Sequence, residues 1–360
     1  MAPKPGEAVL YYSQAMAKVD FGAGHPFRGT RFEGFMQLVK AMGAESCVEM
    51  RVPKPATEED LQLAHTAAYI AHVKEVESYE GALSIDTPVS KGMVEATKMV
   101  VGAALDAGEA LAKEKFKLAM TFGGFHHAGK ESGEGFCVFN DVAIAATAFL
   151  KRHGMKRVLI IDTDAHQGNG TMDIFWNDPR VLFVSIHQDP TTIYPGRGFA
   201  SDVGEGDGRG FTVNIPMPRF SGNRQWAYAL NEVFVPLCRE FKPDVVIRNG
   251  GSDPFYGDDL TELGLDFDGL AEVGRIVRKA SDEGPGKMLD LMVSGYGNFV
   301  TYGWLALFAG VTGCDIDYRK YAKMIAPKPT RTPEAKLDEQ TEMVVAEVKQ
   351  NLREYWKCFG

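Results

Sequence analysis

KRVLIIDTDAHQGNG, residues 156–170, is the segment that decides the fold. Its first half is a short apolar run without polar alternation, which is typical of a strand buried on both faces. Further runs of this kind occur at residues 117–124, 180–187, 243–251 and 289–297. Stretches with a helical pattern lie between such runs, at Val89–Lys115, Asp141–Arg152 and Phe267–Glu283. This alternation predicts an α/β fold, with a central, mostly parallel sheet and helices on both faces.

The domain organisation follows from length and continuity. The chain has 360 residues, of which 45% are hydrophobic and 24% charged, enough for one large core or two ordinary domains. No internal repeat or low-complexity segment interrupts the alternation, and only residues 327–336 have a linker-like composition. We therefore predict a single domain over residues 1–360, with a C-terminal helical extension at about 327–360.

Composition argues against several classes of partner. The net charge is −9 and there is no dense Lys/Arg block, so we expect no direct nucleic-acid partner. No apolar run approaches the roughly 18 residues of a membrane span, and no basic-then-apolar leader opens the chain, so we expect no membrane partner and a cytoplasmic location.

The five cysteines are scattered and lack CxxC spacing. We expect neither a disulfide framework nor a cysteine-ligated zinc site, which fits a reducing compartment.

Polar residues directly follow the strand within residues 156–164. Asp162, Asp164 and His166 stand at alternate positions, and side chains two apart on extended backbone point the same way. Asp253 follows another predicted strand, and ligands of open parallel sheets bind beyond the carboxyl ends of strands. We assign Asp164, His166 and Asp253 as metal ligands. The alternative is that the two aspartates cap the next helix and His166 is an ordinary polar residue.

This ligand set narrows the choice of metal without deciding it. Two oxygen ligands and one nitrogen ligand leave an open coordination position, as in a catalytic zinc site. Iron(II) or manganese would also accept such a hard ligand set. Zinc is therefore the default expectation.

Several motifs together resemble those of the histone deacetylase family, which includes acetoin utilisation proteins and acetylpolyamine amidohydrolases. The motifs, in the family's order, are GGFHHA (123–128), GFCVFND (135–141), DTDAHQGNGT (162–171), YPGRG (194–198), NGGSDP (249–254) and SGYGN (294–298). The match extends from about Gly24 to Gly313. It implies an arginase/deacetylase-like three-layer fold. It also implies metal-dependent hydrolysis of an acylated amine, such as acetyl-lysine, an acetylpolyamine or another small acyl amide.

The resemblance also implies catalytic roles for the tandem histidines. Amide hydrolysis needs a base for the attacking water and an acid for the departing amine, and His126 and His127 can share these duties. In the family's pattern, Asp162 supports one ring and Asn169 the other. A carboxylate favours the charged ring more than an amide does, so we expect the rings to differ in basicity. We expect His127 to be the main general base and acid, with His126 as an electrostatic partner.

The family also places a tyrosine hydroxyl where it donates to the acyl oxygen in the transition state. Tyr296 in SGYGN is the best match, and Tyr302 is the alternative. This loop departs from the usual Gly-Gly-Tyr-Asn pattern, because Ser294 replaces a glycine and Gly297 follows the tyrosine. A second departure is Gln167, which stands where many relatives carry a histidine.

The substrate channel can also be placed by resemblance. The family lines a narrow apolar passage with aromatic side chains, which correspond here to Phe136, after Gly135, and Tyr194. Asp86 matches a rim carboxylate that holds substrate amides, or it is a turn residue at the start of a helix.

A second ion and two further functions stay open at this point. Ser185 and His187 lie where the family holds a structural monovalent cation, such as potassium, on backbone carbonyls; ordinary core polar residues are the alternative. A ureohydrolase of the arginase type shares the sheet and uses aspartate and histidine at two metals. A non-catalytic acyl-lysine-binding protein would retain the pocket and lose turnover through the altered SGYGN loop. An oligomer is compatible with the sequence, which does not define its state.

Overall fold

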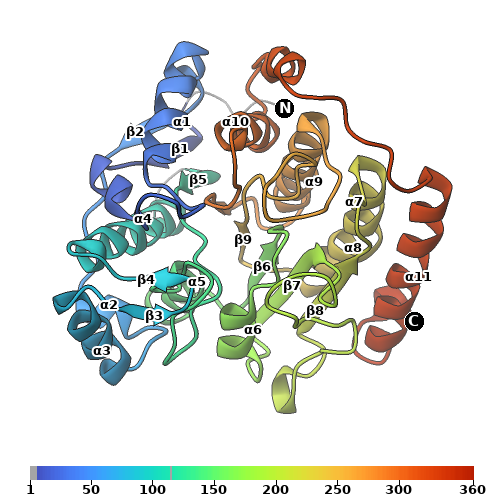
Figure 1. Ribbon diagram of the computed structural model, residues 1–360. Coiled ribbons are helices and arrows are strands. Elements are labelled where there is room, and N and C mark those ends of the chain that lie inside the picture. Colours follow the sequence, from blue (N-terminus) through green and yellow to red (C-terminus); the bar gives the residue numbers. More distant parts are fainter. Residues whose placement is uncertain (1–5, 114–115) are drawn as a thin grey trace.

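A single eight-stranded sheet lies at the centre of the molecule (Figure 1). The computed structural model describes residues 6–113 and 116–360. The strands of the sheet are β1 (Ala8–Tyr11), β2 (Glu49–Arg51), β5 (Leu118–Thr121), β6 (Val158–Asp162), β7 (Val181–Gln188), β8 (Thr212–Met217), β9 (Val245–Asn249) and β10 (Met288–Leu291). Their order is β2-β1-β5-β10-β9-β6-β7-β8, and every described pair in this sheet is parallel. The parallel sheet predicted from the sequence is confirmed.

Helices cover both faces of this sheet (Figure 1). On one face lie α4 (Met93–Lys113), α5 (Asp141–Arg152) and α6 (Asn169–Phe175). On the other lie α1 (Thr30–Ala41), α7 (Asn223–Ala229), α8 (Val235–Phe241), α9 (Phe267–Glu283) and α10 (Val300–Thr312). The predicted helices at 141–152 and 267–283 have the same bounds in the structure. The one predicted at 89–115 begins at Met93, and residues 114–115 lie outside the described part of the chain.

Smaller elements surround these layers. They are α2 (Glu58–Leu61), α3 (Ala67–Ser78), the antiparallel hairpin β3 (Ala82–Ser84) and β4 (Thr87–Pro88), the 3-10 helices η1 (Gln14–Lys18), η2 (Ala44–Cys47), η3 (Gly206–Gly208), η5 (Tyr318–Met324) and η6 (Lys357–Phe359), and the π-helix η4 (Leu230–Phe234). The last long helix, α11 (Glu334–Leu352), packs beside β8 (Figure 1). Beyond it, Trp356 Nε1 donates to the Gly210 carbonyl at 2.7 Å, so the C-terminal segment is hydrogen-bonded to the loop that precedes β8. None of the described helices is long and apolar enough to cross a bilayer.

An ion pair is buried between the central strands β9 and β10. Arg248 lies opposite Asp290 in the ladder, and its guanidinium binds that carboxylate while donating to Thr163 Oγ1 at 3.0 Å. Arg248 is 0% exposed and Asp290 1%. Burial raises the pKa of Asp290, although Arg248 acts in the opposite direction. Each charge therefore depends on the other, because little solvent reaches either.

Asp290→Ala is expected to lower the free energy of unfolding by about 3–5 kcal/mol, because the Arg248 charge would stay buried without its partner. Urea denaturation followed by circular dichroism measures this change. Glu272→Ala is the matched control, since it removes the carboxylate of an exposed pair with Arg275 on α9. Its expected effect is below about 1 kcal/mol. Equal losses in both variants would contradict the importance of burial.

One pair of cysteines departs from the expectation that the chain has no disulfide framework. Cys47, at the end of η2, and Cys314, just after α10, form a disulfide. Their Cα atoms are 6.1 Å apart, although the residues are 267 positions apart in the sequence. Such a pair depends on how the first and last parts of one helical layer pack together. Cysteine spacing alone does not contain that information.

Candidate active site

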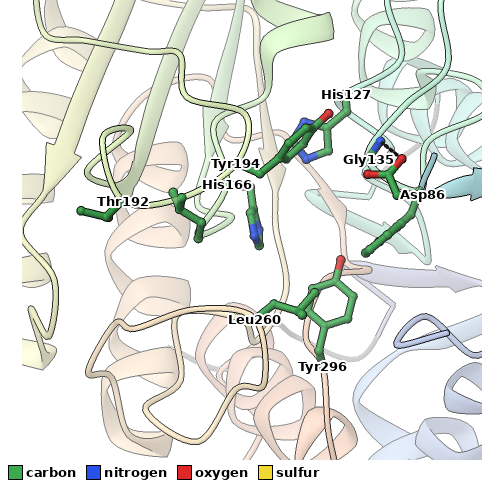
Figure 2. A pocket seen from close by; sticks show the side chains of 10 residues that line it. Asp86, His127, Gly135, His166, Thr192, Tyr194, Leu260 and Tyr296 are labelled. Carbon is green, nitrogen blue, oxygen red and sulfur yellow. Dashed lines mark hydrogen bonds between the residues drawn. The ribbon is translucent and has the colours of Figure 1, made fainter. Parts of the chain in front are cut away.

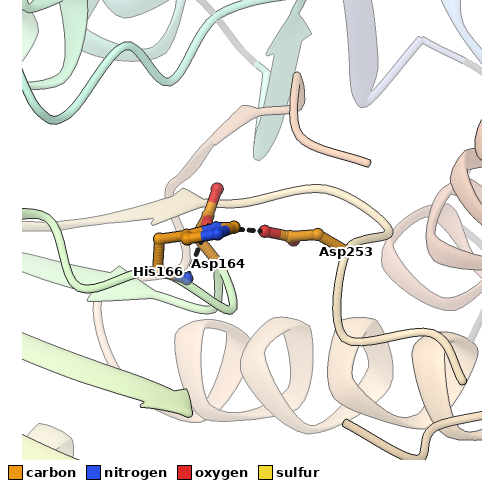
Figure 3. Close-up of side chains that lie close together, drawn as sticks. All are labelled: Asp164, His166 and Asp253. Carbon is orange, nitrogen blue, oxygen red and sulfur yellow. Dashed lines mark hydrogen bonds and ion pairs between the residues drawn. The ribbon is translucent and has the colours of Figure 1, made fainter. Parts of the chain in front are cut away.

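Three side chains converge beyond the carboxyl ends of β6 and β9. Asp164 and His166 follow β6, and Asp253 follows β9. His166 Nδ1 lies 3.2 Å from Asp164 Oδ1 and 3.2 Å from Asp253 Oδ2 (Figure 3). One candidate ligand atom from each residue lies within 4.8 Å of the others. The structure thus brings together the three residues that the sequence assigns to a metal, named here the Asp-His-Asp cluster.

Neighbouring polar groups hold the two carboxylates in place. The backbone N–H of Ala165 donates to Asp253 Oδ2 at 3.1 Å, and that of His166 donates to Asp164 Oδ1 at 2.8 Å. The Ser294 hydroxyl donates to the second oxygen of Asp253, Oδ1, at 2.7 Å. Ser294 is the residue that departs from the family's glycine. In this chain the departure adds a donor to the cluster.

The alternative role of the two aspartates, capping the next helix, does not fit the structure. Helix α6 begins at Asn169, and its N-cap, Gly168, makes no side-chain cap. Asp162 and Asp164 instead accept bonds from His126 and from the backbone N–H of His166, respectively. Both carboxylates therefore belong to the cluster and its surroundings.

The electrostatics of the cluster favour a bound cation. Burial, followed by the neighbouring Asp164 carboxylate, raises the pKa of Asp253 well above its usual range. Burial acts in the same direction on Asp164, but His126 and His166 outweigh it and lower the pKa of Asp164 well below normal. Two carboxylates and one imidazole, turned toward one another with little water, form a donor set that suits a divalent metal. The cluster can therefore bind a metal ion.

The tandem histidines stand beside this cluster in the loop after β5. Asp141, at the start of α5, holds the loop by accepting hydrogen bonds from two of its backbone N–H groups. His126 Nδ1 lies 2.6 Å from Asp162 Oδ2, and His127 Nδ1 lies 2.7 Å from Asn169 Oδ1. The Nε2 atoms of the two rings are 3.1 Å apart. Each ring thus has the supporting partner that the resemblance implies.

The two rings differ in basicity, as the sequence predicts. Burial lowers the pKa of His126, but Asp162 and Asp164 outweigh it and raise the pKa to about 9. For His127, burial acts first, and the neighbouring His126 and His166 lower the pKa further, well below the usual value. These opposite shifts favour a charged His126 and a neutral His127 at neutral pH.

Tyr296 follows β10 and directs its hydroxyl into the same pocket (Figure 2). Burial, together with the two carboxylates of the cluster, raises its pKa well above the usual value, so the hydroxyl stays protonated and can donate. Arg31 steadies this loop by donating to the Gly295 carbonyl at 2.7 Å. Tyr302 instead lies on α10, with its ring stacked on Tyr321 at 4.3 Å between centroids. Of the two candidate tyrosines, Tyr296 is the one that lines the pocket.

The pocket in front of these groups has a volume of about 380 Å³. Phe136 and Tyr194 form aromatic walls, with ring centroids 5.7 Å from Tyr296 and 5.0 Å from His127, respectively. Tyr194 is 39% exposed, so it lies at the mouth. His127 and His166 also line the cavity (Figure 2). A pocket with aromatic walls and several polar lining groups therefore reaches His166 of the cluster.

Asp86 lies at the rim of the pocket but is already engaged with protein groups. Its Oδ1 accepts from Ser84 Oγ at 2.6 Å and from Gly135 N at 3.1 Å, the bond dashed in Figure 2. It sits in the turn between β3 and β4, so the alternative placement at the start of a helix is wrong. Asp86 thus holds Gly135 beside the His127 ring. A Cβ at Gly135 would lie 2.4 Å from His127 Cδ2.

Sequence reasoning missed four residues around the pocket: Thr192, Ile193 and Leu260, which line it, and Glu134, which bonds to Asn169. Thr192 and Ile193 directly precede YPGRG, and Leu260 follows the acidic end of NGGSDPFYGDD. The sequence feature that could have identified these three residues is their position next to the motifs. For Glu134 the feature is a lone carboxylate between two glycines, just before Phe136.

The proposed monovalent-cation region lies along β7. Ser185 Oγ is 2.8 Å from His187 Nδ1, and His187 Nε2 is 2.9 Å from the Gly198 carbonyl oxygen. The two side chains therefore bond within the protein, as core polar residues do. A cation held by backbone carbonyls stays a prediction.

Comparison with known proteins identifies the family to which the chain belongs. The model of the histone deacetylase domain matches residues 25–310. A probable deacetylase of Archaeoglobus fulgidus is 31% identical over 342 residues, covering 93% of this chain and 94% of that protein. The acetoin utilization protein AcuC of Bacillus subtilis is 32% identical, covering 86% and 83%. A histone deacetylase-like amidohydrolase of Pseudomonas aeruginosa is 30% identical, covering 81% and 78%.

A solved structure agrees with this result at the level of the fold. The HDA15 HD domain matches with a TM-score of 0.84 at 24% sequence identity, covering 98% of this chain and 97% of that chain. The arginase/deacetylase-like three-layer fold expected from the sequence is thereby confirmed. With the family model matched from His25 to Gly310, the chain belongs to the histone deacetylase family.

Proposed function

We propose that this protein is a metal-dependent amidohydrolase that removes acetyl, or another short acyl group, from a lysine-like or small-molecule amine. One observation carries the proposal: the Asp-His-Asp cluster, a neutral His127 and a protonated Tyr296 meet around one pocket with aromatic walls. The relatives named deacetylase or amidohydrolase support the same reaction.

Zinc is the proposed metal, with iron(II) as the alternative, held by Asp164, His166 and Asp253. The buried, convergent set of two carboxylates and one imidazole supports this choice. When bound, such an ion polarises the acyl carbonyl and eases deprotonation of water at neutral pH. A structural monovalent cation such as potassium near β7 remains part of the proposal.

The protein's own groups then handle protons and charge. His127 removes a proton from water as the water attacks the acyl carbon, and it returns the proton to the amine nitrogen as the C–N bond breaks. His126, kept charged by Asp162, stabilises negative charge that develops nearby. Tyr296 donates a hydrogen bond to the acyl oxygen as that oxygen gains charge. Phe136 and Tyr194 enclose the alkyl chain of the substrate and exclude water.

A hydrolysis panel tests the proposal. Zinc-reconstituted protein is assayed with acetyl-lysine peptides, acetylated polyamines and longer acyl-lysines. Turnover of one substrate class supports the proposal and identifies the substrate. Metal binding and ligand binding without any turnover would instead favour the non-catalytic acyl-lysine-binding protein. Urea release from guanidino substrates would favour a ureohydrolase.

Tyr296→Phe is expected to lower kcat by about 10²- to 10³-fold on the preferred substrate, because it deletes one donor to the developing oxyanion. Steady-state kinetics measure the loss. Tyr302→Phe is the matched control, since Tyr302 lies on α10 away from the pocket lining, and its kcat should stay unchanged. Similar losses in the two variants would contradict the assignment of Tyr296.

A further inference from the structure

We infer that Glu134 is a positioning residue that acts through Asn169 to hold His127 in the tautomer needed for base catalysis. Asn169 Nδ2 donates to Glu134 Oε1 at 2.6 Å. On its other side, the same amide contacts His127 Nδ1 through Oδ1, at 2.7 Å. The inference rests on the proposed function, because a particular tautomer matters only where His127 transfers a proton.

Glu134 completes a continuous hydrogen-bonded chain of five side chains. The chain runs from Asp162 through His126 to His127, with contacts of 2.6 and 3.1 Å, and on through Asn169 to Glu134. A carboxylate thus stands at each end. His127 has a neutral direct partner, yet it is connected to a negative charge one residue further away.

Counting donors along this chain fixes the proton on His127. A carboxylate only accepts hydrogen bonds, so the NH₂ group of Asn169 must face Glu134. The amide oxygen of Asn169 then faces His127, and because it too only accepts, His127 Nδ1 must carry the hydrogen. The lone pair of His127 is left on Nε2, which lies beside His126, and the His127 ring centroid is 6.2 Å from that of His166 in the cluster.

Loss of Glu134 removes the acceptor bonded to the Asn169 NH₂ group, and with it the direct hydrogen bond that selects this amide orientation. The two ends of an amide have nearly the same shape, so a rotation of about 180° exchanges donor and acceptor. The rotated amide would donate to His127 Nδ1 and favour a hydrogen on Nε2. The nitrogen that must take the proton from water would then already carry one.

The backbone around Glu134 keeps its carboxylate in place. Residues 134–137 form a tight turn in which Cys137 N donates to the Glu134 carbonyl at 2.9 Å, and Gly135 and Phe136 have φ values of 57° and 66°. Asp86 and Thr87 hold the turn from outside, through the N–H groups of residues 135 and 136. Glu134 therefore approaches Asn169 from a constrained position, and the same turn places Phe136 in the channel wall.

The first test compares kinetics of Glu134→Ala and Glu134→Gln in the full-length, zinc-loaded protein. The alanine variant removes the acceptor, whereas glutamine can accept or donate and so no longer selects one amide orientation. Both should lose about 10- to 100-fold in kcat, within the range for lost orienting partners, with KM nearly unchanged. Glu131→Gln is the matched control on the same exposed loop and should retain wild-type kcat. Unchanged kcat in both Glu134 variants would overturn the inference.

The second test reads the tautomer directly, without substrate. NMR of protein with ¹⁵N-labelled histidine distinguishes a hydrogen on Nδ1 from one on Nε2, and the His127→Ala variant identifies the signals. Wild type should show Nδ1–H at His127, and Glu134→Ala a mixture or Nε2–H. An unchanged tautomer would overturn the inference even if the wild type is an active deacylase. Conversely, absence of turnover in the wild type would contradict the proposed function. The NMR measurement of the His127 tautomer would still decide the role of Glu134 in that case.

A third variant separates the route through Asn169 from a route through the channel wall. The Tyr194 hydroxyl also interacts with Glu134: burial, followed by the Glu134 carboxylate, raises the pKa of Tyr194. If Tyr194→Phe reproduced the kcat loss of Glu134→Ala while the His127 tautomer stayed the same in both, Glu134 would act through Tyr194, and the inference would be wrong. A smaller effect of Tyr194→Phe, confined to KM, supports the route through Asn169.

Discussion

Asp253→Ala is expected to abolish measurable hydrolysis and to weaken zinc binding by more than about 100-fold. Asp253 supplies one of three candidate ligand atoms, so its loss should exceed the 10- to 100-fold effect of removing a mere supporting partner. Zinc affinity measured by competition with a chromophoric chelator gives a readout that does not depend on substrate. Activity of the same preparations gives the second readout.

Two companion variants make this result interpretable. Ser294→Ala removes the hydrogen bond to Asp253 Oδ1 and the acceptor of the Gly251 N–H while keeping all three candidate ligands, so zinc affinity should fall by about 10- to 100-fold, less than in Asp253→Ala. Asp259→Ala removes an exposed carboxylate from the same acidic loop and should change neither affinity nor kcat. Wild-type zinc affinity in Asp253→Ala would refute the assignment of the cluster as the metal site.

His127→Ala is expected to lower kcat by about 10²- to 10⁴-fold, the usual contribution of a positioned general acid or base. Burial, followed by His126 and His166, lowers the pKa of the ring well below normal, so the ring is neutral at neutral pH and its Nε2 lone pair can accept a proton. Zinc affinity should persist, because His127 is not part of the Asp-His-Asp cluster. Steady-state kinetics at saturating substrate measure the effect.

Other histidines provide the comparison for this variant. His126→Ala should cost less than His127→Ala, because the charged His126 ring contributes an electrostatic effect and no proton transfer. His72→Ala, on the exposed face of α3, should leave kcat unchanged. A larger loss in His126→Ala than in His127→Ala would reverse the proposed division of roles.

The central strands could be predicted because each buries both faces, so their sequences are short apolar runs. β6 and β9 are buried at every position, and both were found. β2 could not be found in this way, because its three residues are partly or fully exposed and carry no apolar run. The Cys47–Cys314 disulfide was missed for a related reason: it depends on tertiary packing between distant segments, which local patterns do not describe.

The candidate site was predictable where it coincides with ordered motifs. Asp164, His166 and the tandem histidines lie in such motifs, and the structure places them together. Glu134 was not identified from the sequence, because its proposed role depends on Asn169, 35 residues away, and on the orientation of the Asn169 amide. Ser294 was noticed as a departure from the family pattern. Its bond to Asp253 became visible only once β9 and β10 lay side by side.

The order of the strands determines when this site is completed during synthesis. β9 and β10 lie between β5 and β6 in the sheet, yet they are the last of its strands to leave the ribosome. Until then β5 and β6 each present an unpaired edge, and such edges are templates for aggregation. Asp253 arrives only with β9. A nascent chain that stops short of β9 therefore lacks both the strands that cover these two edges and the third residue of the Asp-His-Asp cluster.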